Sequence, residues 1–138
     1  MTKESITIKA TVQANITKAW DYYTNPNHIT NWNFAHESWH CPAASNDLTI
    51  GGKYLARMEA RDGSMGFDFE AIYDEIVEHK KIVYTLTDER KVVIDFLENG
   101  NQTEITVEFE AENQNPIAMQ QAGWQAILNN YKDYTEKH

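Results

Sequence analysis

Three side chains that can bind a metal ion lie close together in the first third of the chain: His36, His40 and Cys41. Imidazole and thiolate groups are ligands that zinc prefers, and two histidines four residues apart converge when the segment is helical. His28 lies nearby in the sequence. However, Pro42 follows directly, the chain has one cysteine, and a closed zinc site uses four ligands. The pattern favours loop histidines that bond to the backbone, and we expect no metal.

Cys41 could also act as a nucleophile with the adjacent His40 as its base. A reactive cysteine needs its pKa lowered by a nearby base or a helix N-terminus, whereas neighbouring side chains often point apart. The sequence contains no catalytic triad, no dinucleotide fingerprint and no phosphate-binding loop. We therefore expect an unreactive Cys41 and no cofactor. An enzyme of cyclase or hydrolase type, with His28, His36 or His40 as acid or base, is the weakest hypothesis.

Three carboxylates, Asp68, Glu70 and Asp74, share one predicted strand. They alternate with aromatic residues, and successive side chains of a strand point to opposite faces. General acid–base catalysis needs carboxylates in a desolvated cleft. We expect these three to form a charged, solvent-facing side of a sheet.

Large aromatic side chains on the opposite face form the set best suited to hold a small apolar molecule. Gly123, inside a predicted helix, costs about 1 kcal/mol relative to alanine, which indicates close approach of a strand or space left for a ligand. The alternative is a fully packed core. The predicted ligand-binding residues are Trp32, Phe34, Trp39, Tyr54, Met58, Phe67, Phe69, Tyr84, Phe96, Met119, Gly123, Trp124 and Leu128.

Strands with period-two alternation must position most of these residues. The pattern predicts a first strand over residues 5–12, a short helix capped by Asn15 or Thr17, and a second helical turn from Pro26 to Thr30. Residues 31–47 lack periodicity and are predicted to be irregular. Five further alternating runs, separated by short turns, favour antiparallel hairpins.

The final element is a long helix predicted from Pro116 to Lys137, with Asn115 as its N-cap. A sheet with one dry face must pack that face against another layer, and this helix alone is long enough. The predicted class is α+β: a twisted antiparallel sheet of six to seven strands wrapped around the C-terminal helix. Two short helices follow the first strand, and residues 1–138 form a single domain.

The net charge of −9 argues against nucleic acid and anionic membrane surfaces as partners, because no basic stripe is present. No apolar run approaches the length of a membrane span, and one cysteine fits a reducing compartment. We expect a cytoplasmic protein that is a monomer or a weak homodimer.

The chain resembles the START-like, helix-grip superfamily, and within it the group related to the C-terminal domain of the Hsp90 ATPase activator. The resemblance rests on residues 20–24, 32–42, 47–54, 66–70, 99–103 and 123–128. It implies a helix-grip fold and, as functions, binding of a lipid- or polyketide-like molecule between sheet and helix, or interaction with a chaperone. A small hydrophobic ligand is the leading hypothesis, and a chaperone partner is the second.

Overall fold

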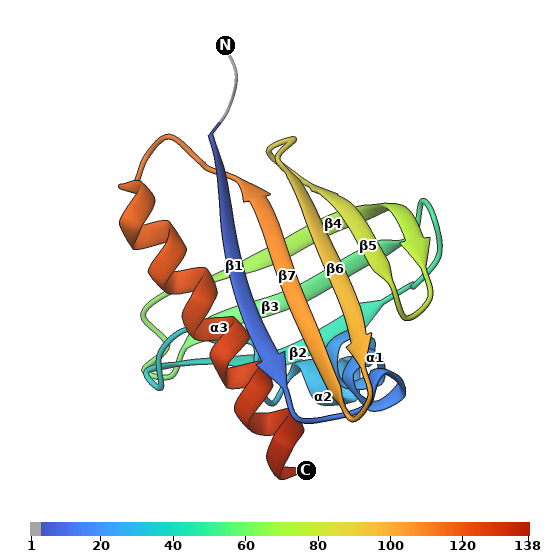
Figure 1. Cartoon of the computed structure of the whole chain (residues 1–138). Helices are drawn as coiled ribbons and strands as arrows, with labels where there is room; N and C mark the ends of the chain where they lie inside the picture. Colours follow the sequence, from blue (N-terminus) through green and yellow to red (C-terminus); the bar gives the residue numbers. More distant parts are fainter. Residues whose placement is uncertain (1–3) are drawn as a thin grey trace.

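One curled antiparallel sheet of seven strands, in the order β1-β7-β6-β5-β4-β3-β2, dominates the computed structural model, which describes residues 4–138 (Figure 1). The strands are β1 (Ser5–Val12), β2 (Trp39–Asn46), β3 (Lys53–Ala60), β4 (Gly66–Val77), β5 (Lys81–Leu86), β6 (Lys91–Asn99) and β7 (Gln102–Glu110). The helices are α1 (Ile16–Thr24), α2 (Pro26–Ile29) and α3 (Ile117–Lys137). The predicted α+β class and element order are confirmed.

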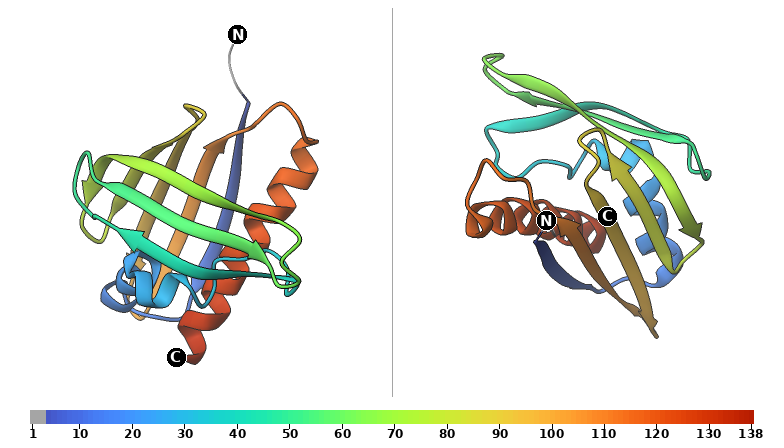
Figure 2. Two further views of the ribbon diagram at one scale, coloured as in Figure 1. Left: turned by 180° about the vertical axis from the view of Figure 1, so that it is seen from behind. Right: turned by 90° about the horizontal axis from the view of Figure 1, so that it is seen from above.

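The curl brings β2, β3 and β4 across the same side of β1, β7 and β6 that α3 covers (Figure 2). Strand β4 pairs with β3 on one side and with β5 on the other. Its pairing with β5 shifts register between Tyr73 and Glu75. Such a bulge bends a strand and increases its twist. The bulge in β4 therefore helps to turn a flat ladder into a wrapped one with an interior.

The interior face of the sheet is apolar because each strand alternates inward and outward residues. In β5, for example, Ile82, Tyr84 and Leu86 are buried, whereas the residues between them are half-buried. Helices α1 and α2 close one end of the interior, where the ring of Trp20 lies 5.0 Å from that of Phe96. Trp20 and Phe96 are both buried in this contact.

Most of the buried residues of helix α3 lie in its C-terminal half. Leu128, Tyr131 and Thr135 are buried, and the Tyr131 hydroxyl donates a hydrogen bond to the carbonyl of Ala19 at 2.6 Å. Met119, near the N-terminus of α3, is 62% exposed. In the N-terminal half, Gln120 is buried and Trp124 stacks on Phe109. No helix among residues 4–138 is long and apolar enough to cross a membrane.

The prediction that residues 31–47 are irregular is wrong for Trp39–Asn46, which form strand β2. The pairing of β2 with β3 skips Cys41 and Pro42, where the register shifts. Proline cannot donate to a ladder and is tolerated at a bulge on an edge strand, which is where Pro42 lies. The bulge hides the alternation that would have marked this strand.

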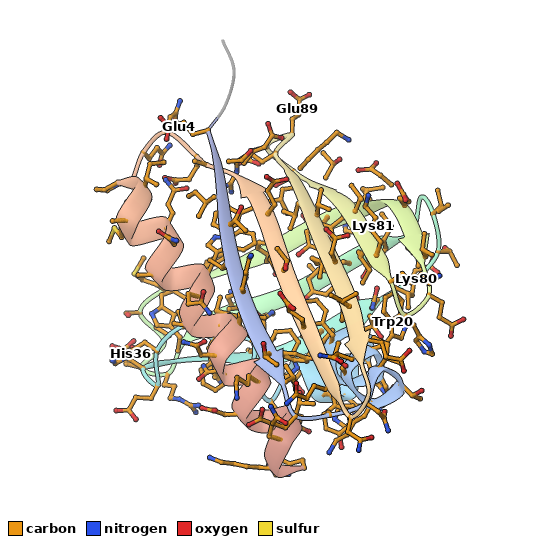
Figure 3. All side chains as sticks on the ribbon, in the orientation of Figure 1. Glu4, Trp20, His36, Lys80, Lys81 and Glu89 are labelled. Atoms are coloured by element: carbon orange, nitrogen blue, oxygen red, sulfur yellow. The ribbon has the colours of Figure 1, made fainter. Side chains whose placement is uncertain are left out.

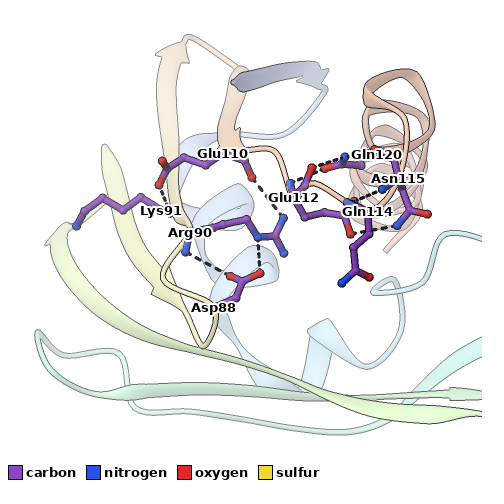
Figure 4. Close-up of polar contacts among 8 residues, drawn as sticks. All are labelled: Asp88, Arg90, Lys91, Glu110, Glu112, Gln114, Asn115 and Gln120. Atoms are coloured by element: carbon purple, nitrogen blue, oxygen red, sulfur yellow. Dashed lines mark hydrogen bonds and ion pairs between the residues drawn. The ribbon is translucent and has the colours of Figure 1, made fainter. Parts of the chain in front are cut away.

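The N-cap prediction for α3 is also wrong, although that for α1 is confirmed by the hydrogen bond from Lys18 N–H to the Asn15 side chain. Pro116 is the N-cap of α3 and makes no side-chain cap bond. The Asn115 amide instead donates to Glu112, whose other carboxylate oxygen accepts the Asn115 backbone N–H at 2.6 Å (Figure 4). Gln120 donates back to the carbonyls of Glu112 and Asn115. A polar network thus holds the start of the helix.

Candidate functional site: an aromatic cavity beneath α3

A cavity of about 340 Å³ lies between β3, β4 and β5 of the sheet, the α1–α2 end and the N-terminal half of α3. Its volume is in the range of small-molecule sites. The predicted residues that line it are Trp32, Tyr54, Met58, Phe67, Phe69, Tyr84, Trp124 and Leu128. The structure therefore brings most of the predicted aromatic set together around one cavity.

The remaining predicted residues lie elsewhere. Phe96 is buried against Trp20 of α1, Trp39 packs against Phe67 beside the cavity, and Met119 faces outward. Phe34 and Gly123 are half-buried and do not line the cavity. Phe96, Met119 and Gly123 were assigned to the site from strand and helix periodicity, which gives the face of an element and not the depth along it. Phe34 and Trp39 were assigned as aromatic residues of a stretch without periodicity.

Aromatic contacts explain why the space stays open. Trp124 stacks on Phe109 with ring centroids 3.9 Å apart, and the ring of Phe69 meets its edge at 6.2 Å. Tyr54 and Tyr84 stack on each other at 6.0 Å from neighbouring parts of the sheet. Because these rings are held by one another, they are not free to collapse into the centre.

Gly123 has room for a side chain. A Cβ built at this position meets nothing within 4 Å, so the expected close approach of a strand is absent. We expect Gly123→Ala to raise the free energy of unfolding by about 0.5–1 kcal/mol, because alanine is the better helix former. Urea denaturation measures this change. A loss of stability would mean that the backbone at Gly123 is closer to its neighbours than described.

Polar residues that the sequence reasoning missed line both ends of the cavity. At the end formed by the β5–β6 turn and the β7–α3 connection lie Arg90, Glu112, Asn115 and Gln120 (Figure 4). Arg90 donates to Asp88 at 2.7 Å and to the carbonyl of Glu110 at 3.3 Å. Arg90, Glu112 and Asn115 come from a turn and a connection, where no periodicity indicates which way a side chain points, whereas Gln120 lies in the first turn of α3.

Tyr23, Asn33 and Tyr73 lie at the opposite, α1–α2 end, and sequence reasoning missed these three as well. Tyr23 is the neighbour of Tyr22 in a short helix, and either could have faced inward. The Tyr73 hydroxyl donates to the Asn46 side chain at 2.6 Å, and Asn46 in turn donates to the carbonyl of Thr24. This chain of bonds ties β4 to α1 across β2.

Burial raises the pKa of the Tyr23, Tyr54 and Tyr84 phenols well above their ordinary value. Desolvation is the main cause, and the proximity of the phenols to one another adds to it. Burial likewise raises the pKa of Tyr73 and Tyr131. All five groups are therefore protonated at neutral pH.

This enclosure predicts alkaline unfolding. The folded-state pKa of each phenol is higher than the value of 10.0 for an exposed tyrosine, so the contribution to stability is present below pH 10 and is lost above it. The loss approaches about 1.4 kcal/mol per pH unit for each group. Tyrosinate absorbance should rise together with the loss of circular dichroism. Ionisation of these phenols near pH 10 with the circular dichroism unchanged would contradict their enclosure.

The histidines are dispersed. His28 bonds to the Tyr134 hydroxyl at 2.9 Å, His36 to the Ser38 hydroxyl at 2.9 Å, and His40 lies 3.8 Å from a Glu59 carboxylate oxygen. Within the described part of the chain, no three His, Cys, Asp or Glu side chains are grouped so that they could hold a metal ion.

Cys41 is buried, and desolvation raises the pKa of its thiol. A raised pKa keeps the sulfur protonated, which is the opposite of what a nucleophilic cysteine needs. The three carboxylates of β4 also lie away from the cavity, as predicted. Asp68 pairs with Arg57 at 3.3 Å, and Glu70 pairs with Lys53 at 2.6 Å. These groups form the outer face of the sheet.

A curled antiparallel sheet that grips a long C-terminal helix over an apolar cavity defines the class of START-like, helix-grip proteins. The profile of the family described as Activator of Hsp90 ATPase homolog 1-like protein matches residues 13–136. The chain belongs to this family. A search of curated proteins found no match to the sequence.

Solved structures agree with the assignment. The solution structure of the AHSA1-like protein from Aeromonas hydrophila is 34% identical, with a TM-score of 0.91 and coverage of 97% of this chain and 93% of that one. A protein from Cytophaga hutchinsonii is 48% identical, with a TM-score of 0.84 and coverage of 96% and 92%. The Aha1 dimer from Colwellia psychrerythraea is 13% identical, with a TM-score of 0.76 and coverage of 96% of each chain, which shows a shared fold alone.

Proposed function

We propose that this protein binds a small hydrophobic or aromatic molecule in the cavity between the sheet and α3. The observation that carries the proposal is the cavity itself, about 340 Å³ lined mainly by aromatic and aliphatic side chains. A flat apolar molecule that enters it exchanges water for contact with several rings at once. Burial of apolar surface contributes roughly 25 cal/mol per Å².

The entrance fits a ligand that arrives from solution. Phe67 lines the cavity yet is 50% exposed, and Trp39 packs beside it with ring centroids 6.0 Å apart. An aromatic ring that is both exposed and part of the wall gives an incoming apolar molecule its first contact.

A fluorescence titration with N-phenylnaphthylamine, a neutral aromatic probe, tests the proposal. We expect emission to rise and to saturate at one probe per protein, because the probe emits weakly in water and strongly in an apolar site. Unlabelled aromatic hydrocarbons should compete for the same site. A linear increase without saturation, or several probes per chain, would count against a defined cavity site.

A role as a partner of an Hsp90-type chaperone is the second candidate, and the family match over residues 13–136 is the observation that favours it. Such a role would use a protein surface, and the net charge of −9 suits a basic partner surface. Measurement of chaperone ATPase rates with and without the protein tests it. No change in rate, together with no co-purification, would remove this candidate and leave cavity binding untouched.

A further inference from the structure

Three phenol groups from three different elements line the cavity at its α1–α2 end: Tyr23 of α1, Tyr54 of β3 and Tyr84 of β5. The Tyr54 and Tyr84 rings stack with an interplanar angle of 13°, and the nearby Tyr84 phenol contributes to the raised pKa of Tyr54. A purely apolar ligand cannot use the hydrogen-bonding capacity of three hydroxyls at one end of the pocket. Their arrangement gives the cavity a polar pole.

Tyr23 and Tyr84 both line the cavity, and their hydroxyls have no partner within the described part of the protein. Neither makes a hydrogen bond to another residue in the range 4–138. Yet no fully enclosed side-chain nitrogen or oxygen in that range lacks a partner. Both hydroxyl oxygens are therefore reached from the cavity space. The Tyr54 hydroxyl accepts a hydrogen bond from the Asn33 amide at 3.3 Å, which leaves its own O–H able to donate.

Two other buried tyrosines show the contrast. The Tyr73 hydroxyl donates to Asn46 and the Tyr131 hydroxyl donates to the carbonyl of Ala19, each at 2.6 Å. The protons of these two hydroxyls are used in hydrogen bonds within the protein. Tyr23, Tyr54 and Tyr84 thus differ from the other buried phenols in keeping donors that a ligand can use.

The polar pole carries no charge. The charged residues that line the cavity are Arg90 and Glu112, which lie toward the other end. Figure 3 marks the separation, with Glu89, next to Arg90, at one end of the molecule and Trp20, in the helix of Tyr23, at the other. Protonated phenols without a cation beside them donate well to a neutral oxygen, whereas an ionised oxygen there would lose its hydration without a counter-charge.

We propose that Tyr23, Tyr54 and Tyr84 form a hydrogen-bonding anchor that selects neutral ligands carrying an oxygen acceptor, such as the carbonyl of an aromatic ketone. The inference rests on the proposed cavity binding and names the class of ligand. The carbonyl oxygen lies among the three hydroxyls, and the apolar body of the ligand extends under Trp124 toward the mouth. Donation from several fixed groups to one acceptor gives both orientation and selectivity.

A pair of matched probes tests the anchor: acetylnaphthalene, a neutral ketone, and ethylnaphthalene, its hydrocarbon counterpart, with affinities measured by calorimetry. Tyr23→Phe and Tyr84→Phe should each weaken binding of the ketone about 3- to 10-fold, as expected for one hydrogen bond. Binding of the hydrocarbon should not weaken. Each variant removes one oxygen that has no partner in the fold, so the thermal midpoint should be unchanged or higher.

Tyr22→Phe is the matched control. Tyr22 lies next to Tyr23 in α1 but stacks on His28 and does not line the cavity. Its replacement should change neither affinity. Naphthoate, the ionised analogue of the ketone, should bind more weakly than acetylnaphthalene to the unaltered protein.

Equal effects of Tyr84→Phe on ketone and hydrocarbon would overturn the anchor while leaving cavity binding in place. Tighter binding of naphthoate than of the ketone, lost in Tyr84→Phe, would overturn the preference for neutral ligands. Absence of saturable binding by both naphthalene probes would overturn the anchor together with the proposed function.

Discussion

Ile127→Trp is expected to weaken N-phenylnaphthylamine binding by at least about tenfold. Ile127 lines the cavity from α3 and is only half-buried, so a larger side chain can project into the space without displacing the packed C-terminal half of the helix. An indole there would take up much of a cavity of about 340 Å³. Loss of the contacts of even a few ligand atoms exceeds the 1.4 kcal/mol that corresponds to tenfold. Probe fluorescence gives the dissociation constant.

Ile117→Trp provides the control on the same helix. Ile117 is 39% exposed and does not line the cavity, so this variant adds the same ring without reducing the space. Its affinity should equal that of the unaltered protein. Equal affinities for Ile127→Trp and Ile117→Trp, with both variants folded by circular dichroism, would place the probe outside the cavity.

Gly52→Ala is expected to lower the free energy of unfolding by about 3 kcal/mol or more. A Cβ at Gly52 would lie 2.1 Å from the carbonyl oxygen of Asp47 and 2.9 Å from that of Thr49. Neither backbone oxygen can move freely, because the turn is fixed to β4: Tyr73 N–H donates to the Gly52 carbonyl at 3.0 Å, and Gly51 N–H donates to the Tyr73 carbonyl at 2.8 Å. Strain of this kind is among the few causes of large single-residue effects.

Urea denaturation of Gly52→Ala and Gly123→Ala side by side separates the two glycines. The same substitution should destabilise the turn and stabilise the helix, since a Cβ at Gly123 meets open space. A midpoint for Gly52→Ala equal to that of the unaltered protein would show that the turn relaxes without cost. Because Tyr73 belongs to the cavity wall, any folded Gly52→Ala protein should also bind the probe more weakly.

Much of the fold follows from local patterns. Alternation of apolar and polar residues predicted the β3 to β7 ladder, since a half-buried strand must show that period. Strand β2 was missed because the bulge at Cys41 and Pro42 breaks the alternation. The N-cap of α3 was wrongly assigned for a different reason, since Asn115 is a good cap by type but bonds to Glu112 instead.

The cavity was predictable in part. Periodicity correctly assigned Tyr54, Phe69 and Trp124 to the interior, but it could not tell a residue beside the space from one packed at the closed end, as Phe96 is. The depth of the cavity depends on the distance between α3 and the sheet. That separation is set by contacts distant in sequence, such as the bond from Tyr131 to Ala19.

Local sequence patterns could not predict that Arg90 lines the cavity. It lies in a turn, where side-chain direction follows from the hydrogen bonds to Asp88 and Glu110 and not from any period. The same holds for the phenol of Tyr23, whose helix is too short for its inward face to be read from spacing. Arg90 and Tyr23, at the two ends of the cavity, were therefore identified as lining residues only from the structure.

The most direct test of cavity binding is a set of intermolecular nuclear Overhauser effects between bound N-phenylnaphthylamine and the isotopically labelled protein. Cross-peaks should connect the probe to the Leu128 methyls, the Met58 methyl and the Trp124 ring, all of which line the cavity. Cross-peaks confined to Leu97 and Ile50, which are exposed and do not line the cavity, would contradict cavity binding.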